Sequence, residues 1–502
     1  MAQWKSLGGG AGLALLLGTT AQADVTAAEV WQSWQDFSAN MGQTMTAGSE
    51  EMSGDTLTVT DVSMSAEMPD GSMTGSLGFV KFKELGDGTV EISMSEEYPL
   101  VVTTEVEGED PVEVAVTVTQ KDVRMIASGD ATALSYDFSS PEMGVVLDSI
   151  TGAPEGGTFT LNVAIKGIVG KYLMTPGEIE EVETEFSADS LSMDVTAADP
   201  ATSGEFTMKA TVDAIESFST LAMAADTDLE DMAAALEAGF ATEGSFTYGK
   251  IAATFDFKDA TSSGNMVSSV ASGGIEIALD QDELTYGVTS NGADITLVSS
   301  DMPFPQVNAK IAESGFLMTM PVSVSEEPQA FSLVTKLVDL TVSDEIWGMF
   351  DPGAVLPRDP ATLIVDLAGE AKWLVDIFAM DPEAPSEEVP GELSALTLNQ
   401  LKLTVGGADL SGTGAFTFDN TDTTTFPGMP KPAGSIDVTL VGGNGLLDKL
   451  VLMGLLPEDQ AMGAKMMMGM FGRVTEGAED TLTSQIEMKE DGSIFANGQQ
   501  IQ

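Results

Sequence analysis

Residues 396–418 read LTLNQLKLTVGGADLSGTGAFTF, and residues 436–440 read IDVTL. Apolar and polar residues alternate through both segments, with one slip in the first of them, and a period of two is typical of β-strands. Such alternation leaves one apolar face and one solvated face, as in antiparallel sheets. The stretch therefore predicts neighbouring antiparallel strands.

The apolar period changes to that of a helix after this stretch. The apolar residues that recur at helical spacing are Leu446, Leu447, Leu450, Val451 and Leu455. Pro457, followed by two acidic residues, predicts the start of a second helix, and Gly472 predicts its end. We expect this helix pair, residues 446–471, to cover the end of the sheet with its Leu and Met side chains. Asp491-Gly492 and Asn497-Gly498 then predict closing hairpins.

A short helix is also expected near the N-terminus, where Thr26 and Glu29 have the spacing of a capping box. Its apolar residues fall on one side: Val30, Trp31, Trp34 and Met41. The two tryptophans can plug the end of a sheet core or lie at a membrane surface. Acidic neighbours disfavour an anionic membrane surface, so we expect the core position.

The rest of the chain repeats the two-residue alternation, from about Thr56 onward, with a slip near Thr60 that suggests a β-bulge. One mid-chain helix is expected at Asp228–Phe240, a hairpin turn at Asn291-Gly292, and an acidic loop at 381–391. The predicted fold is mainly β. It is a long curved antiparallel sheet, a meander of hairpins, with a short N-terminal helix, one mid-chain helix and the C-terminal helix pair. We divide it into β-rich halves at 24–260 and 261–502.

The charge of the chain restricts its partners. Twenty Lys and Arg residues against 79 Asp and Glu residues give a net charge of −59. Such a surface repels phosphate backbones, so no nucleic-acid partner is expected, and it also repels anionic headgroups. The chain has no His and no Cys. This removes Ser-His-Asp triads, Cys nucleophiles and the usual zinc, haem and copper ligands, and we expect a protein without enzymatic activity or cofactor.

Residues 1–23 have the pattern of a secretory signal peptide. Lys5 provides a positive start, Leu13 to Leu17 an apolar stretch, and Ala21 and Ala23 frame an A-x-A cleavage site. The stretch is too short to span a bilayer as a helix. We therefore expect a mature chain without a transmembrane segment, released into the periplasm.

Two acidic turns have oxygen ligands spaced for calcium. One contains Asp280 and Asp282, the other Asp419 and Asp422, but neither has the glycine and the glutamate of an EF-hand loop. Acidic turns are common in an acidic protein, so an ordinary solvated turn is the simpler interpretation. A methionine cluster could capture copper(I), but methionine on an apolar helix is usually core filler. Its members are Met462, Met466, Met467, Met468 and Met470.

Two segments resemble a known family. They are Trp347 to Pro360, with WGMFDP and LPRDP, and Gly445 to Pro457, with GLLDKL and GLLP. In them the chain is similar to the uncharacterised alphaproteobacterial family called domain of unknown function 2125. That resemblance implies no activity and no catalytic residue. Residues 401–418 and 491–501 also resemble the C-terminal region of AsmA-like envelope proteins, which implies a curled β-sheet with an apolar groove for lipid.

Three functions are compatible with these features. The first is a periplasmic envelope protein that binds lipid or another apolar ligand along the apolar face of the sheet, or that has other envelope proteins as partners. The alternatives are a calcium-assisted adhesive or scaffold protein at the cell surface and an outer-membrane β-barrel. The barrel is disfavoured because five Tyr and five Trp residues are few for two aromatic girdles. Whether the apolar face is an open groove or a packed core is left open by the sequence.

Overall fold

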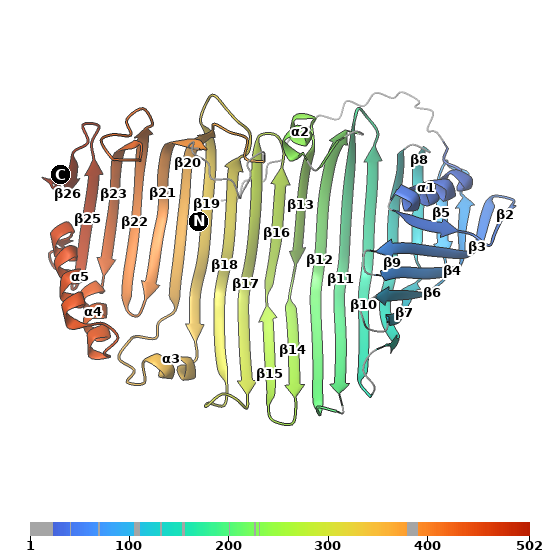
Figure 1. Cartoon of the computed structure of the whole chain (residues 1–502), viewed down its shortest axis with the longest axis horizontal. Coiled ribbons are helices and arrows are strands. Elements are labelled where there is room, and N and C mark those ends of the chain that lie inside the picture. The colour runs from blue at the N-terminus through green and yellow to red at the C-terminus, as the bar shows by residue number, and fades with distance from the viewer. Residues whose placement is uncertain are drawn as a thin grey trace.

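The chain folds around one very large antiparallel β-sheet (Figure 1). The computed structural model describes residues 24–40, 42–68, 71–104, 111–130, 133–152, 156–199, 201–224, 227–229, 231–378 and 390–502. Within these residues it contains 27 strands, all in the same sheet, and five helices. The expected signal peptide with Ala21 and Ala23, and nearly all of the acidic loop at 381–391, lie outside the described residues.

The first part of the sheet begins with α1 and nine strands. These are α1 (Ala27–Asn40), β1 (Gln43–Thr46), β2 (Ser49–Ser53), β3 (Thr56–Met68), β4 (Gly71–Glu84), β5 (Val90–Met94), β6 (Glu97–Thr104), β7 (Val112–Lys121), β8 (Arg124–Asp130) and β9 (Ala133–Thr151). The short strands β5 and β6 pair with different halves of β4, and β8 and β7 pair with different halves of β9. Two short strands therefore share one long neighbour.

The middle of the sheet contains its longest strands. The elements are β10 (Thr158–Thr175), β11 (Ile179–Asp199), β12 (Gly204–Ala224), α2 (Met232–Glu237), β13 (Ala241–Tyr248), β14 (Ile251–Lys258), β15 (Ser263–Val270), β16 (Ser272–Leu279), β17 (Glu283–Ser299), β18 (Val307–Pro321) and β19 (Gln329–Val342). Here β13 and β14 share the long neighbour β12, and β16 and β15 share β17. The expected boundary at 260/261 falls in the turn between β14 and β15, and the sheet continues across it.

The last part of the chain adds strands and three helices. They are α3 (Asp344–Phe350), β20 (Ala361–Trp373), β21 (Gly391–Val405), β22 (Ala408–Asp419), β23 (Lys431–Val441), α4 (Gly443–Leu452), α5 (Glu458–Phe471), β24 (Arg473–Val474), β25 (Thr481–Met488), β26 (Ile494–Ala496) and β27 (Gln499–Gln500). The two edges of the sheet, β1 with β2 and β26 with β27, are made of short strands. Short edge strands offer few free backbone groups to another chain.

A crease crosses the sheet at mid-height. Strands β10, β11 and β12 each have one residue there that is left out of the ladder: Gly167, Asp189 and Ala214. The register is the same on both sides of these residues, but the alternation of side chains shifts. Ile165 and Ile168, three positions apart, consequently lie in one apolar cluster. The same crease passes through Gly292 and Ala312 of β17 and β18, and through the breaks between β13 and β14 and between β15 and β16.

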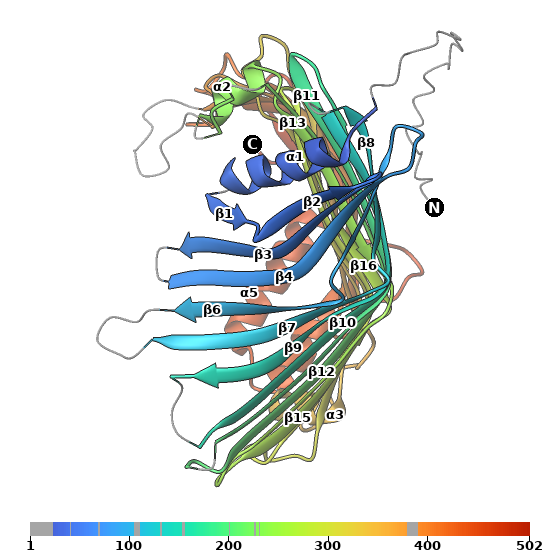
Figure 2. The ribbon, with the colours of Figure 1, turned by 90° about the vertical axis from the view of Figure 1, so that its right-hand side faces the viewer.

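The crease contributes to the curvature of the sheet, because a residue with positive φ inside a strand departs from the extended backbone conformation and bends the strand locally. Gly167, Ala214 and Gly292 have φ values of 63°, 50° and 65°. Figure 2 shows the result, a sheet that curves along its strands so that one side is hollow. In β3, Asp61 has a φ of 51° and is likewise left out of the ladder, so the slip in alternation expected near Thr60 is present. The β3–β4 register is the same on both sides of it, so the slip is not the β-bulge that was predicted.

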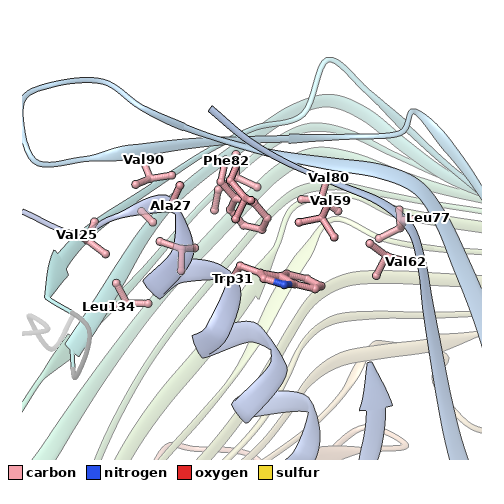
Figure 3. Close-up of a cluster of buried hydrophobic side chains, with 14 residues drawn as sticks. Val25, Ala27, Trp31, Val59, Val62, Leu77, Val80, Phe82, Val90 and Leu134 are labelled. Atoms are coloured by element: carbon pink, nitrogen blue, oxygen red, sulfur yellow. The ribbon is translucent and has the colours of Figure 1, made fainter. Parts of the chain in front are cut away.

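Helix α1 packs over the N-terminal strands on the hollow side (Figures 2 and 3). Its capping box forms as predicted: Glu29 Oε2 accepts from Thr26 N at 2.9 Å, and Thr26 Oγ1 accepts from Glu29 N at 3.4 Å. Trp31 is only 3% exposed, and the Trp34 ring meets Phe82 edge-on with centroids 5.4 Å apart. The expected core position of the two tryptophans is confirmed.

Two local predictions are corrected, and one helix was not predicted. Asn291-Gly292 is not a hairpin turn but lies inside β17, at the crease. The mid-chain helix is shorter than Asp228–Phe240, because α2 covers only six residues. Helix α3 was not expected. The closing hairpins are confirmed, since the Asp491-Gly492 and Asn497-Gly498 turns separate β25, β26 and β27.

Candidate functional site

The candidate site is the hollow side of the sheet, here called the inner face. It is the side on which α1, α2 and α5 lie (Figure 2). Leu236 of α2 packs against Leu221 and Leu284 of the sheet. At the other end, Ser484 Oγ of β25 donates to the Phe471 carbonyl oxygen of α5 at 2.7 Å. We define the inner face as the strand residues whose side chains lie on the same side of the sheet as these residues. Opposed residues of antiparallel strands point to the same side, so the strand pairing identifies the members of this face.

Apolar residues stand opposite one another along the inner face. One row crosses six neighbouring strands, β16 to β21, through Ile277, Tyr286, Met318, Leu333, Leu367 and Leu398. A second row runs towards the C-terminal edge through Leu337, Leu363, Leu403, Leu410, Leu440 and Leu482. The strand alternation seen in the sequence therefore assembles into one apolar surface, because the registers bring equivalent positions side by side.

The inner face carries no charge over most of its length. Among the described residues of β10 to β23, no inner position holds Asp, Glu, Lys or Arg, apart from the strand ends and the crease. One residue in five of the chain is charged, so this separation is not a matter of composition. A ligand on this face would displace water without burying an unpaired charge.

The charges lie on the opposite, outer face, where lysines pair with acids on neighbouring strands. These pairs are Lys166–Glu142, Lys209–Asp194, Lys310–Asp294, Lys336–Glu313 and Lys402–Asp409. The Asp294 pair is the closest at 2.8 Å, and the pKa of Asp294 is lowered, first by its hydrogen bond to Lys310 and then by Asn308. Exposed pairs of this kind contribute little to stability individually, but they keep the outer face in water.

Between the helices, large inner side chains remain exposed. Eight of them, each 38–45% exposed, come from β10, β12 to β14, β16 and β17: Phe159, Phe206, Phe246, Phe257, Ile275, Ile277, Tyr286 and Ile295. The buried hydrophobic clusters lie under α1, under α2 and along the crease. Six of the eight exposed side chains stand opposite one another in pairs: Phe206 and Phe257, Phe246 and Ile275, and Ile277 and Tyr286. Groups of exposed apolar side chains of this kind mark binding surfaces. Over this central part, among the residues described, the apolar face is exposed and is not a packed core.

The first calcium candidate is built from turn residues. Asp280 Oδ1 accepts from the backbone N–H groups of Asp282 and Glu283 at 2.8 and 3.0 Å. These are the hydrogen bonds of an Asx-type turn between β16 and β17. The carboxylate of Asp280 thus has a structural role in the turn.

The second candidate brings its two acids to one lysine. Lys431 Nζ lies 3.5 Å from Asp419 Oδ2 and 3.3 Å from Asp422 Oδ2. Hydrogen bonds from the Thr425 N–H and hydroxyl lower the pKa of Asp422, and those from Thr421 lower the pKa of Asp419. The Asp422 hydrogen bond in turn raises the pKa of Lys431. In the described part of the chain, no group of three or more acidic side chains is arranged to hold a metal ion.

The methionine cluster does not have the expected position. Met462, Met466, Met467 and Met470 are 59–66% exposed. Helix α5 turns its other side inward, with Ala461 buried and Met468 and Phe471 half-buried. The prediction that these methionines fill a core is therefore wrong for four of the five, because the smaller alanine side of the helix meets the protein.

The two segments that carried the family resemblance meet around the β21–β22 turn. A Cβ atom on Gly406 would lie 3.1 Å from Leu446 Cδ1 and 3.7 Å from Leu356 Cδ2. Asp351, buried beside them, accepts from the Val355 and Leu356 N–H groups at 2.9 Å each. Burial alone would raise the pKa of Asp351, but these hydrogen bonds hold it below its usual value. The junction fixes α3, α4 and the sheet relative to one another.

Comparison with known proteins gives one match. Residues 265–497 match the model of a family described as an uncharacterized protein conserved in bacteria, DUF2125. This region belongs to the DUF2125 family. The DUF2125 region extends from β15 to the turn after β26 and contains both resembling segments, so that part of the resemblance is confirmed.

The remaining comparisons add nothing to the DUF2125 assignment. No curated protein and no solved structure matches the chain. The likeness to AsmA-like envelope proteins thus stays a prediction. No helix among the described residues has the length and hydropathy needed to cross a membrane.

Proposed function

We propose that the protein is exported to the bacterial cell envelope and binds lipid, or a similar apolar molecule, along the inner face. The observation that carries this proposal is the exposed inner face without charges, in a chain whose net charge is −59. A solvated face of such a protein would be expected to carry acids. A binding role, with no catalysis, fits a surface that offers apolar contact and few polar groups.

The size of the exposed surface suits an acyl chain. The exposed residues from β10 to β17 span five strand spacings, or about 24 Å at about 4.8 Å each. The hydrocarbon tail of a lipid reaches about 15 Å, half of a bilayer core of about 30 Å. Each CH₂ group gains about 0.8 kcal/mol on full burial. A tail lying on an open face keeps one side in water, so we expect roughly half of this gain per CH₂ group.

Export is supported by the sequence alone. Residues 1–23 have the charge, apolar stretch and cleavage site of a signal peptide. Cell fractionation combined with N-terminal sequencing tests this part. We expect a periplasmic protein that begins at Asp24, and an uncleaved cytoplasmic protein would contradict it.

Lipid binding is tested first on the native protein. We expect organic extraction and mass spectrometry of the mature protein, purified without detergent from its own cells, to recover lipid in stoichiometric amount. A fluorescent fatty-acid probe then measures affinity for the lipid-free protein in solution.

A matched pair of substitutions locates the binding surface. Ile277 on the inner face is 44% exposed, and Val267 on the outer face is 45% exposed. Ile277→Asp puts a carboxylate under the ligand and should weaken probe binding at least tenfold, whereas Val267→Asp should leave it unchanged. Equal effects of the two substitutions, or a protein free of lipid that binds no probe, would contradict the proposal.

A further inference from the structure

The helix pair at the C-terminal end of the sheet has an exposed apolar surface of its own. Three methionines of α5 follow one another at intervals of four residues, Met462, Met466 and Met470, with Met467 beside them. Residues four apart lie on one side of a helix. Leu452 at the end of α4 and Leu455 in the turn before α5 are also exposed. We call the outward side chains of these six residues the α4–α5 surface.

The charge of this region differs from that of the whole chain. Residues 443–474 contain three acids, Asp448, Glu458 and Asp459, and three bases, Lys449, Lys465 and Arg473, so 3 − 3 leaves a net charge of 0. The chain as a whole carries −59. Lys465 is also paired with Asp448 at 2.5 Å. This part of the protein therefore has no excess of charge to desolvate when it lies against an uncharged surface.

We infer that the α4–α5 surface docks onto a lipid bilayer surface with zwitterionic headgroups. The six residues include no Tyr, Trp or Arg, the residue types that most often supply the hot spots of protein interfaces, and a protein partner is therefore treated as an outcome of the test. Methionine and leucine are flexible apolar side chains, which suit insertion among acyl chains. Helix α5 is also attached to the inner side of the sheet, since Ser484 of β25, the last long strand, donates a hydrogen bond to the Phe471 carbonyl at the end of α5.

Docking is tested by flotation of the mature full-length protein with phosphatidylcholine vesicles. We expect the wild type to float with the vesicles, and the double variant M466D/M470D to lose at least nine-tenths of the bound fraction. The two methionines are 66% and 61% exposed, so the double variant should keep the melting temperature of the wild type.

The matched control is M349D/M429D, which changes two methionines elsewhere that are 69% and 60% exposed. It should float like the wild type. Vesicles that contain phosphatidylglycerol should bind less protein at low salt, because the chain is strongly acidic. Failure of the wild type to float, equal losses in both double variants, or a dimer seen by light scattering that M466D/M470D disrupts would each overturn the inference.

This inference does not depend on the ligand of the inner face. The fatty-acid probe, measured without vesicles, should bind M466D/M470D as it binds the wild type. If the probe fails to bind while flotation persists, the proposed function is wrong and membrane docking stands.

Discussion

At the scale of single residues, the carboxylate of Asp480 caps a helix that has no capping side chain of its own. Helix α4 begins after Gly442, which has no side chain to cap the helix. Asp480 takes this role from a distant loop: its Oδ2 accepts from Gly445 N, and its Oδ1 from Asn444 Nδ2, each at 2.8 Å. A carboxylate at a helix N-terminus satisfies free N–H groups and interacts well with the helix dipole.

We therefore predict that Asp480→Asn lowers the free energy of unfolding by about 1 kcal/mol, the usual value of an N-terminal cap. Asn is chosen because Asp480 has a φ of 44°, which Asn tolerates better than other residues. Urea unfolding measures the change. Glu479→Gln, the same charge change on the exposed neighbouring residue, should stay within about 0.5 kcal/mol of the wild type.

The same residue gives a pH dependence. Burial by itself would raise the pKa of Asp480, but hydrogen bonds from Gly445 and Asn444 lower it below its usual value. A lowered folded-state pKa stabilises the protein fully above the unfolded value of about 3.9, and this stability is lost as the pH falls through the folded pKa. The difference between wild type and Asp480→Asn should thus be constant near neutral pH and shrink below about pH 4. A difference that grows on acidification would contradict the assignment.

At the scale of elements, the crease shows how long strands are bent without losing their register. Gly292 lies in the middle of β17 with a φ of 65°, and a Cβ atom added there would come within 3.0 Å of Ala271 Cβ. Positive φ is costly for any residue with a side chain. The glycine is therefore required by the bend of the strand, although it does not form a turn.

We predict that Gly292→Ala lowers the free energy of unfolding by about 1–2 kcal/mol, through the left-handed backbone conformation. Gly315 on the neighbouring strand β18 is the control, because its φ is not positive and an added Cβ would find its nearest neighbour at 3.5 Å. Gly315→Ala should be neutral or slightly stabilising. Chemical unfolding of both variants checks the pair, and equal effects would show that the crease is not strained.

At the scale of the whole molecule, charge and shape act together. The acids cover the outer face and the loops, and a net charge of −59 opposes a compact state by self-repulsion. Salt screens this repulsion, with a Debye length that falls from about 30 Å at 0.01 M to about 3 Å at 1 M. The inner face, which carries no charge, should be little affected by screening.

We predict that the melting temperature of the mature protein rises by several degrees between 20 mM and 500 mM sodium chloride, with the same rise in potassium chloride. Differential scanning fluorimetry is sufficient. Calcium and magnesium at equal millimolar concentrations should give equal shifts, because Asp280 is engaged by backbone N–H groups and Asp419 and Asp422 are held by Lys431. A shift specific to calcium would instead favour the calcium-assisted scaffold.

The sequence by itself determined the strands, the capped first helix and the C-terminal helix pair. Each depends on local physics: a two-residue alternation, the Thr26–Glu29 capping box, and a proline before two acids at Pro457. It also predicted that Trp31 lies in a core, because acidic neighbours disfavour the alternative position at an anionic membrane surface. These features need only the neighbours along the chain.

The tertiary structure decided what depends on distant neighbours. Asn291-Gly292 suits a tight turn and an interior bend equally well, because both need positive φ, and the strands that flank β17 on both sides select the bend. The sequence of α5 does not say whether its methionines are buried or exposed. The side of the helix that contains Ala461 is buried against the protein, and this turns the methionines outward. Likewise, alternation makes one face of the sheet apolar, but whether that face is packed or exposed depends on what lies over it. In the described chain the helices cover only parts of this face and leave Ile277 and its neighbours in contact with solvent.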